Sequence, residues 1–123
     1  MSELQAIFDT LKERMKAYQP PFTARMDDDA HYDLWSEKDL VIDGRKRKDV
    51  YFAGLIIQKN YVGLYYMPVY ASEEVKNLFS PELLSRLKGK SCFHIKKLDP
   101  QLLEQIDDAL KTGFDLYRER GWV

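Results

Sequence analysis

The chain has 123 residues. This length predicts one domain, residues 1–123, because domains commonly run about 100–150 residues. Nineteen basic and twenty acidic side chains give a formal net charge of −1, which argues against the strongly basic class of nucleic-acid-binding proteins. The single cysteine excludes an internal disulfide and a multi-cysteine metal site, and it suits a reducing cytoplasm. With no long apolar run and no signal-peptide pattern, we expect a cytoplasmic protein with no membrane partner.

The first predicted element is an amphipathic helix from Ser2 to about Tyr18. Ser2 and Gln5 match a capping box, and Pro20 with Pro21 ends the helix because a residue before proline avoids helical geometry. The apolar residues that recur at helical spacing are Leu4, Ile7, Phe8, Leu11, Met15 and Tyr18. This stripe predicts packing against a sheet.

Two short apolar runs follow, His31–Ser36 and Leu40–Ile42, and each predicts a short strand. The pair Asp43-Gly44 predicts a tight turn, because glycine adopts a positive φ without steric cost. A basic run, Arg45–Lys48, comes directly after that turn.

The clearest strand pair consists of Val50–Gln58 and Tyr61–Met67, joined by a two-residue turn at Lys59-Asn60. A turn of this length predicts an antiparallel register, and the expected pairs on the more aliphatic face are Ile57 with Val62, Leu55 with Leu64, and Ala53 with Tyr66. The opposite face then pairs two glycines, Gly54 and Gly63, with larger side chains.

The remainder of the chain is predicted to be mainly helical. Short helices are expected after Ser72 and after Ser80, the second ending at Gly89, and Ser91–Lys97 is expected as a strand. Asp99 caps a long final helix. The element order predicts an α+β fold: an antiparallel sheet of about four to five strands, with the N- and C-terminal helices packed mainly on one face.

The aromatic strand face is the first candidate site. Glycines inside strands often mark a close approach by another group, and tyrosine combines an apolar ring with a polar hydroxyl. The predicted ligand-binding residues are Phe52, Gly54, Tyr61, Gly63, Tyr65 and Met67. The alternative is that a helix or a second subunit covers this face.

The acidic segment from Asp27 to Asp43 is the second candidate site, with seven carboxylates and one histidine. Carboxylate oxygens with one imidazole suit iron(II) or another divalent ion. The predicted metal ligands are Asp28, Asp29, His31 and Asp33. Their spacing matches no defined metal-binding loop, so the alternative is a solvated acidic loop.

Two further patterns concern catalysis and anion binding. Cys92 and His94 share a strand face, but no orienting group or oxyanion donor accompanies them, which favours a structural pair and no enzyme activity. Gly89-Lys90-Ser91 is not a phosphate loop, because Leu84 stands where the motif needs glycine.

Two basic segments, Arg45–Lys48 and the region around Arg86–Lys97, offer an anionic ligand or RNA a docking site if they converge, with tyrosines available for stacking. The near-zero net charge argues against nucleic acid as a partner.

One further pattern combines five segments: Phe52–Leu55, Tyr61–Tyr70, Leu87–Ile95, Gly113-Phe114 and Tyr117. In these segments the chain resembles the YdhG-like family of small bacterial domains. The resemblance implies a single YdhG-like domain, with an antiparallel sheet and flanking helices similar to those of type III secretion chaperones. Because some members are described as frataxin-like iron chaperones, it also implies iron as a possible ligand.

Taken together, these patterns predict a cytosolic, non-enzymatic binding module without a resident cofactor, either a monomer or a homodimer. We expect it to bind a protein partner or a small ligand through the aromatic strand face or a sheet edge. The alternative is a frataxin-like iron chaperone that uses the acidic 27–43 segment.

Overall fold

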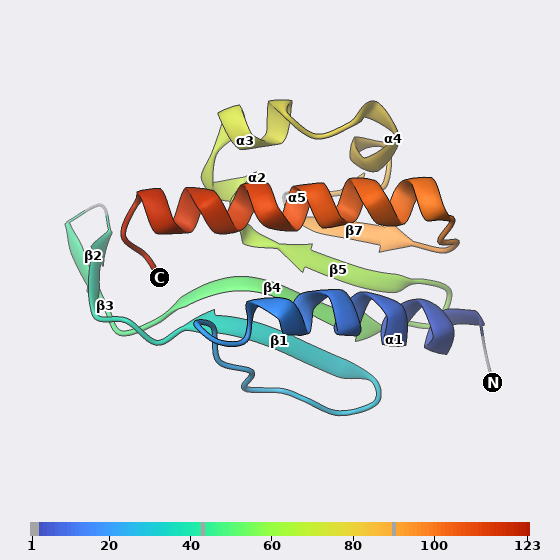
Figure 1. Cartoon of the computed structure of the whole chain (residues 1–123), viewed down its shortest axis with the longest axis horizontal. Helices are drawn as coiled ribbons and strands as arrows, with labels where there is room; N and C mark the ends of the chain where they lie inside the picture. The colour runs from blue at the N-terminus through green and yellow to red at the C-terminus, as the bar shows by residue number, and fades with distance from the viewer. Residues whose placement is uncertain (1–2, 43, 90) are drawn as a thin grey trace.

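The computed structural model describes residues 3–42, 44–89 and 91–123 (Figure 1). The helices are α1 (Glu3–Met15), the short 3-10 helix η1 (Lys16–Tyr18), α2 (Met67–Ala71), α3 (Glu73–Asn77), α4 (Pro81–Leu84) and α5 (Pro100–Glu119). The strands are β1 (His31–Ser36), β2 (Leu40–Ile42), β3 (Arg45–Arg47), β4 (Val50–Ile57), β5 (Val62–Tyr66), β6 (Leu87–Lys88) and β7 (Cys92–Ile95).

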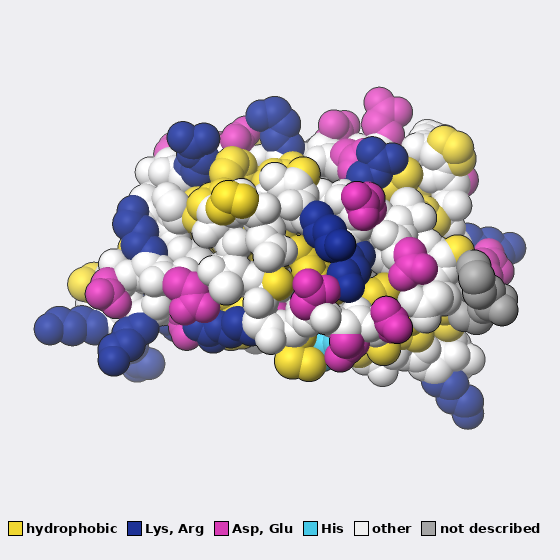
Figure 2. Space-filling model, turned by 60° about the horizontal axis from the view of Figure 1, so that its bottom comes forward, with side chains coloured by type: hydrophobic (Ala, Val, Ile, Leu, Met, Phe, Trp, Pro, Cys, Tyr) yellow, Lys and Arg dark blue, Asp and Glu magenta, His cyan; other side chains and the backbone are white. Residues whose placement is uncertain are grey.

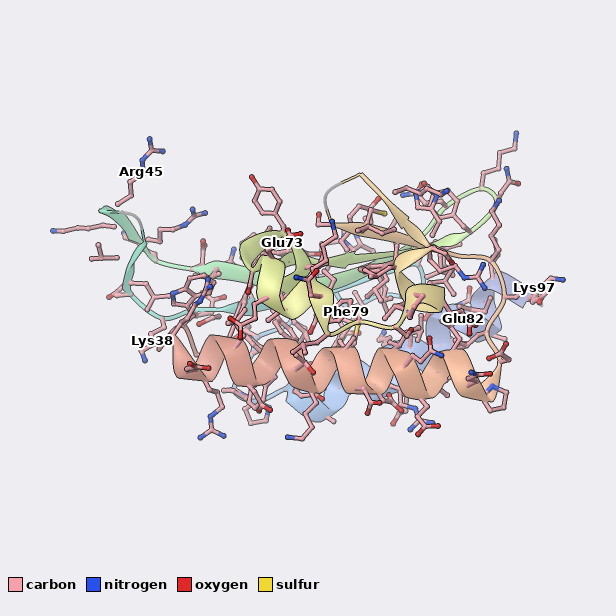
Figure 3. The ribbon with its side chains drawn as sticks, turned by 90° about the horizontal axis from the view of Figure 1, so that it is seen from above. Lys38, Arg45, Glu73, Phe79, Glu82 and Lys97 are labelled. Atoms are coloured by element: carbon pink, nitrogen blue, oxygen red, sulfur yellow. The ribbon has the colours of Figure 1, made fainter. Side chains whose placement is uncertain are left out.

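Five of the strands form one antiparallel sheet in the order β1-β4-β5-β7-β6. The two long helices, α1 and α5, lie together on one side of this sheet (Figures 1 and 3). The predicted α+β class is therefore confirmed. We call the side of the sheet opposite α1 and α5 the open face, because no long helix of the described residues lies on it.

The β4–β5 hairpin has the predicted register. Ile57 pairs with Val62, Leu55 with Leu64 and Ala53 with Tyr66. The predicted second strand is too long by one residue at its end, because Met67 already begins α2.

The fifth strand of the sheet was not predicted. The helix expected up to Gly89 ends at Leu84, and β6 follows it and pairs with β7. Gly89 has a φ of +79° and lies in the connection from β6 to β7, so its role is in a strand connection and not at a helix end.

A β-bulge between β1 and β4 changes which side of the sheet the next residues face. Leu34 pairs with Ala53, but the next residue, Trp35, pairs with Tyr51 and leaves Phe52 without an opposite partner. An extra residue in one strand reverses the alternation of the side chains beyond it. Phe52 therefore joins the core, and Tyr51 points to the open face.

The ring of Phe52 is completely buried under the helices. It stacks on Phe22 with ring centroids 4.3 Å apart, and it contacts Tyr66 and Tyr117 edge to face. The predicted placement of Phe52 on the ligand-binding face is therefore wrong, because strict alternation along the strand takes no account of the bulge. Met67 is also absent from that face, since it lies in α2.

Each terminal helix buries an apolar stripe against the sheet. The buried residues of α1 are Ile7, Phe8, Leu11 and Met15, and those of α5 are Leu102, Ile106, Ala109, Leu110, Gly113 and Tyr117. The predicted caps of the later helices are present: the side chains of Ser72, Ser80 and Asp99 each accept a backbone hydrogen bond from the residue three positions on. The expected cap at Ser2 lies outside the described residues.

Gly113 permits the closest approach between α5 and the sheet. A Cβ at this position would lie 1.9 Å from the hydroxyl oxygen of Tyr66 and 2.7 Å from Pro68. The Tyr66 hydroxyl donates a hydrogen bond to the carbonyl of Ala109, so the ring fixes α5 above β5. Any larger residue at 113 would push the helix away from the sheet.

The strands β2 and β3 form a separate two-stranded sheet at one end of the molecule (Figure 1). The turn residue Asp43 lies outside the described residues, and Gly44 has the expected positive φ of +78°. The basic residues Arg45–Lys48 are all exposed, and dark-blue side chains project from this end of the molecule in Figure 2.

The position of Phe52 gives a direct test of the bulge. We expect Phe52→Ala to lower the free energy of unfolding by about 3–5 kcal/mol, the usual loss when a buried aromatic ring is deleted. Urea denaturation measures this loss, and Leu78→Ala is the control, because Leu78 is 68% exposed and its truncation should change stability by less than about 0.5 kcal/mol. Equal stabilities for the two variants would place Phe52 on the open face.

Candidate functional site on the open face of the sheet

Cross-strand pairing arranges the open-face side chains in rows. The first row contains His31, Ile56, Gly63 and His94. The second row contains Asp33, Gly54, Tyr65, Cys92 and Lys88. The third row contains Trp35 and Tyr51. Four strands therefore contribute an aromatic ring to one surface: β1, β4, β5 and β7.

The two glycines of this face lie beneath tyrosine rings of the same chain. A Cβ on Gly54 would lie 1.9 Å from the hydroxyl oxygen of Tyr51, and a Cβ on Gly63 would lie 3.0 Å from the ring of Tyr65. The close approach that these glycines indicate is therefore made by Tyr51 and Tyr65 themselves. The surface is therefore a layer of rings over glycines.

Further ring contacts extend this layer across the sheet. Tyr61 stacks on His94 with centroids 3.7 Å apart and planes 11° from parallel. Trp35 meets Tyr51 edge to face at 5.0 Å. All four of these side chains are half-buried, so each ring is supported by the sheet and still reaches the surface. We call this set, with Tyr65, the aromatic layer.

Ionic contacts hold the β1 end of the aromatic layer. The guanidinium of Arg25 lies 4.3 Å from the ring of Trp35 and also pairs with Glu37 at 3.1 Å and Asp49 at 2.8 Å. These carboxylates raise the pKa of Arg25. The charge of Arg25 is therefore balanced by acids of the same chain, and its planar group covers one ring of the layer.

The outer edge of β1 is occupied by the chain that precedes it. Thr23 and Trp35 exchange two backbone hydrogen bonds of 2.8 and 2.9 Å, and the backbone N–H of Asp33 donates to the carbonyl of Met26. The carboxylate of Asp33 in turn accepts hydrogen bonds from the backbone of Arg25 and Met26. This edge is thus already paired over most of its length, which favours the face over the β1 edge as a binding surface.

Cys92 lies on β7 beside Tyr65 and is half-buried. Burial raises the pKa of its thiol, and a hydrogen bond with Tyr65 offsets only part of that rise. Since the thiolate is the nucleophilic form, this environment keeps the sulfur in its less reactive state. The arrangement fits a packing role for Cys92.

The structure places four of the six predicted ligand-binding residues, namely Gly54, Tyr61, Gly63 and Tyr65, on the open face. Tyr51 was absent from the predicted ligand-binding set, because strict alternation along the strand does not show the bulge that turns it outward. The set also left out Trp35 and His94, although the alternation of their own strands already separated both from the core residues beside them.

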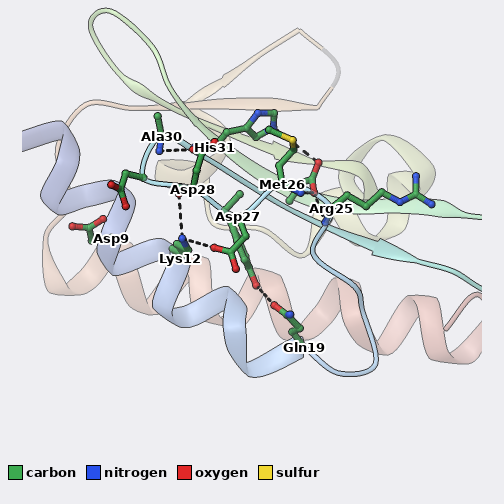
Figure 4. A network of polar contacts seen from close by, with 12 residues as sticks. Asp9, Lys12, Gln19, Arg25, Met26, Asp27, Asp28, Ala30 and His31 are labelled. Carbon is green, nitrogen blue, oxygen red and sulfur yellow. Dashed lines mark hydrogen bonds and ion pairs between the residues drawn. The ribbon is translucent and has the colours of Figure 1, made fainter.

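The acidic segment is held against α1 by hydrogen bonds and ion pairs (Figure 4). Lys12 pairs with Asp27 at 2.6 Å, and its ammonium donates to the carbonyl of Asp28. The Asp28 carboxylate accepts the backbone N–H groups of Ala30 and His31, both at 2.8 Å, and these bonds lower its pKa. One oxygen of Asp28 is therefore committed to a turn.

Contacts within the chain engage the four predicted metal ligands. Asp33 comes within 4.0 Å of His31, but its other oxygen accepts two backbone hydrogen bonds, and Asp29 contributes its carbonyl to a bond from Gln5. Among the described residues, no three histidine, cysteine or acidic side chains form a group that could hold a metal ion. Iron binding by this segment stays a prediction.

The two basic segments do not converge. Figure 3 shows Arg45, on the β2–β3 hairpin, and Lys97, after β7, at opposite ends of the molecule. Two of the larger hollows in the structure also lie away from the aromatic layer: one of about 500 Å³ beside Tyr18 and Asp107, and one of about 510 Å³ beside Val41 and Lys46.

Comparisons with known proteins add no family to this picture. The chain matches no protein-family model, no curated protein and no solved structure. None of the helices in the described part of the chain is long and apolar enough to span a bilayer.

Anaerobic calorimetric titration with iron(II) tests the metal prediction. We expect weak, non-saturating heat, because Asp28 and Asp33 each use a carboxylate oxygen to accept two backbone hydrogen bonds. A saturable signal near one iron per chain that disappears in Asp29→Ala, a variant that leaves those backbone bonds intact, would contradict this expectation and support the iron chaperone.

Alkylation with iodoacetamide tests the state of Cys92. We expect its rate at pH 7.5 to fall well below that of glutathione and to rise steeply only above about pH 9, because the raised thiol pKa leaves little thiolate at neutral pH. Fast alkylation at pH 7 would instead indicate an activated cysteine and revive an enzymatic role with His94.

Proposed function

We propose that the chain is a binding module and that the open face of its five-stranded sheet is the binding surface. The observation that carries the proposal is the aromatic layer: rings from β1, β4, β5 and β7 meet on a face that neither α1 nor α5 covers. A protein partner or a small ligand with planar, apolar groups would find there the contacts that such rings make well.

The rigidity of the layer supports this proposal. Tyr51 and Tyr65 rest on glycines, and Tyr61 rests on His94, so the rings lose little conformational freedom when a ligand arrives. The hollows named above lie elsewhere, so we expect recognition by stacking and edge contacts with the rings. Enclosure of a ligand in a deep pocket does not fit this geometry.

A non-enzymatic role is part of the same proposal. The nucleophile nearest to the layer is Cys92, and burial raises the pKa of its thiol. His94, the nearest base, has its ring stacked flat against Tyr61. Both groups contribute to the packing of the surface, which favours binding over catalysis. The proposal also includes membership of the YdhG-like family and a cytoplasmic location.

Mapping by NMR with a panel of small aromatic fragments tests the proposed surface. We expect amide shift changes to concentrate on β5 and β7, and to fall at least about threefold in Tyr61→Leu, which removes one stacking ring. Tyr70→Leu is the matched control, because Tyr70 is 57% exposed and belongs to α2, not to the aromatic layer. Shift changes confined to the hollow beside Tyr18, or none on the sheet, would overturn the proposal.

A further inference from the structure

The β5–β7–β6 half of the open face carries basic side chains beside its rings. Lys88 pairs with Cys92, which pairs with Tyr65, so the three residues lie side by side across the sheet. The backbone N–H of His94 donates to the carbonyl of Arg86, which places Arg86 next to the stacked pair of His94 and Tyr61. Lys96 follows β7 directly.

The segments that form this half of the face carry no acidic residue. The strands β4, β5, β6 and β7 contain no aspartate or glutamate, and neither does the stretch 83–98. Within the described residues, Arg86 and Lys88 take part in no ion pair, and the Nε of Arg86 is buried without a hydrogen-bond partner. Arg25, at the other end of the layer, is instead balanced by Glu37 and Asp49.

We propose that this half of the open face binds single-stranded nucleic acid. The inference rests on the proposed function, and it names the partner of the same surface. Unpaired bases would stack on Tyr61 and Tyr65, while the phosphates between them would contact Arg86 and Lys88. Proteins that hold single strands combine these two features, an aromatic platform and a basic track.

The geometry favours single strands over the alternatives. Stacking on a flat sheet requires bases that are free of their own partners, so a duplex gains only the phosphate contacts. A protein partner would have to place acidic groups next to planar rings at the spacing of phosphates. A nucleotide chain has a phosphate and a planar base in every unit. The net charge of −1 does not oppose this reading, because the stretch 83–98 holds basic residues and no acidic ones, so its local charge is positive.

The second basic segment provides a control of matched charge within the same chain. Arg45–Lys48 is fully exposed at the β2–β3 hairpin, and Arg45 lies at the opposite end of the molecule from Lys97. Binding driven by bulk charge alone would depend on this hairpin at least as much as on Lys88. Binding by the proposed surface would not.

Fluorescence anisotropy with a labelled, mixed-sequence RNA of about 12 nucleotides, within the site sizes of single-strand binders, tests the proposal. We expect Tyr61→Leu to weaken binding about tenfold through the loss of one stacking contact, and Tyr61→Phe to bind as the unmodified protein does. Lys88→Glu should also weaken binding about tenfold and lower the slope of log affinity against log salt by about one or more. Lys46→Glu and Tyr70→Leu should stay within about twofold.

Several outcomes would overturn the inference. The first two are the absence of RNA binding by the unmodified protein and equal losses of affinity in Lys46→Glu and Lys88→Glu. The third is equal affinity for a duplex of the same sequence. The fourth is complete displacement of the RNA by AMP that itself binds as tightly as the RNA does. The last result would identify a free nucleotide as the ligand. Urea denaturation of each variant tests whether a loss of binding is caused by unfolding. Tyr61→Phe keeps the aromatic ring and removes only the hydroxyl, and Lys88→Glu tests the same surface if Tyr61→Leu is unstable.

The two proposals fail separately. Fragment shifts on β5 and β7 without RNA binding would reject the nucleic-acid partner and leave the binding surface in place. RNA binding that depends on Tyr61 and Lys88 would support both. The absence of both signals would reject the proposed function together with this inference.

Discussion

The ring of Phe52 is the contact on which the rest of the structure depends. It stacks on Phe22 and meets Tyr66 and Tyr117 edge to face, so one side chain joins β4 to β5, to α5 and to the segment before β1. The bulge opposite β1 places Phe52 in this position, and the same bulge turns Tyr51 to the other side of the sheet. The core and the candidate site are thus set by one irregularity in one strand pair.

The two sides of the sheet then have different uses for aromatic residues. On the helix side the rings are buried among aliphatic side chains, and Tyr66 reaches α5 through the space that Gly113 leaves. On the open face the rings lie on glycines and on one another and are half-exposed. Packing within the chain therefore holds each ring in place and leaves part of its apolar surface exposed. A surface of this kind is costly to leave in water unless a partner covers it for part of the time.

The electrostatics divide this open face further. At the β1 end, Arg25 is neutralised by Glu37 and Asp49, and the acidic segment is tied to α1 through Lys12. At the β6 end, the stretch 83–98, which contains Arg86 and Lys88, has no acidic residue. A net charge near zero therefore conceals an uneven distribution, and binding depends on the local field and not on the sum.

Local sequence patterns correctly predicted the α+β class, the register of the β4–β5 hairpin and the caps at Ser72, Ser80 and Asp99. They could do so because turn length, side-chain period and capping chemistry act over a few residues. They also placed Tyr61 and Tyr65 on a common face. The side on which Phe52 lies, the existence of β6 and the placing of Lys88 and Tyr65 on either side of Cys92 emerge only from the folded chain. Each of these features depends on pairing between strands. The local pattern of one segment does not show which strand will pair with it or where a bulge will shift that pairing by one residue.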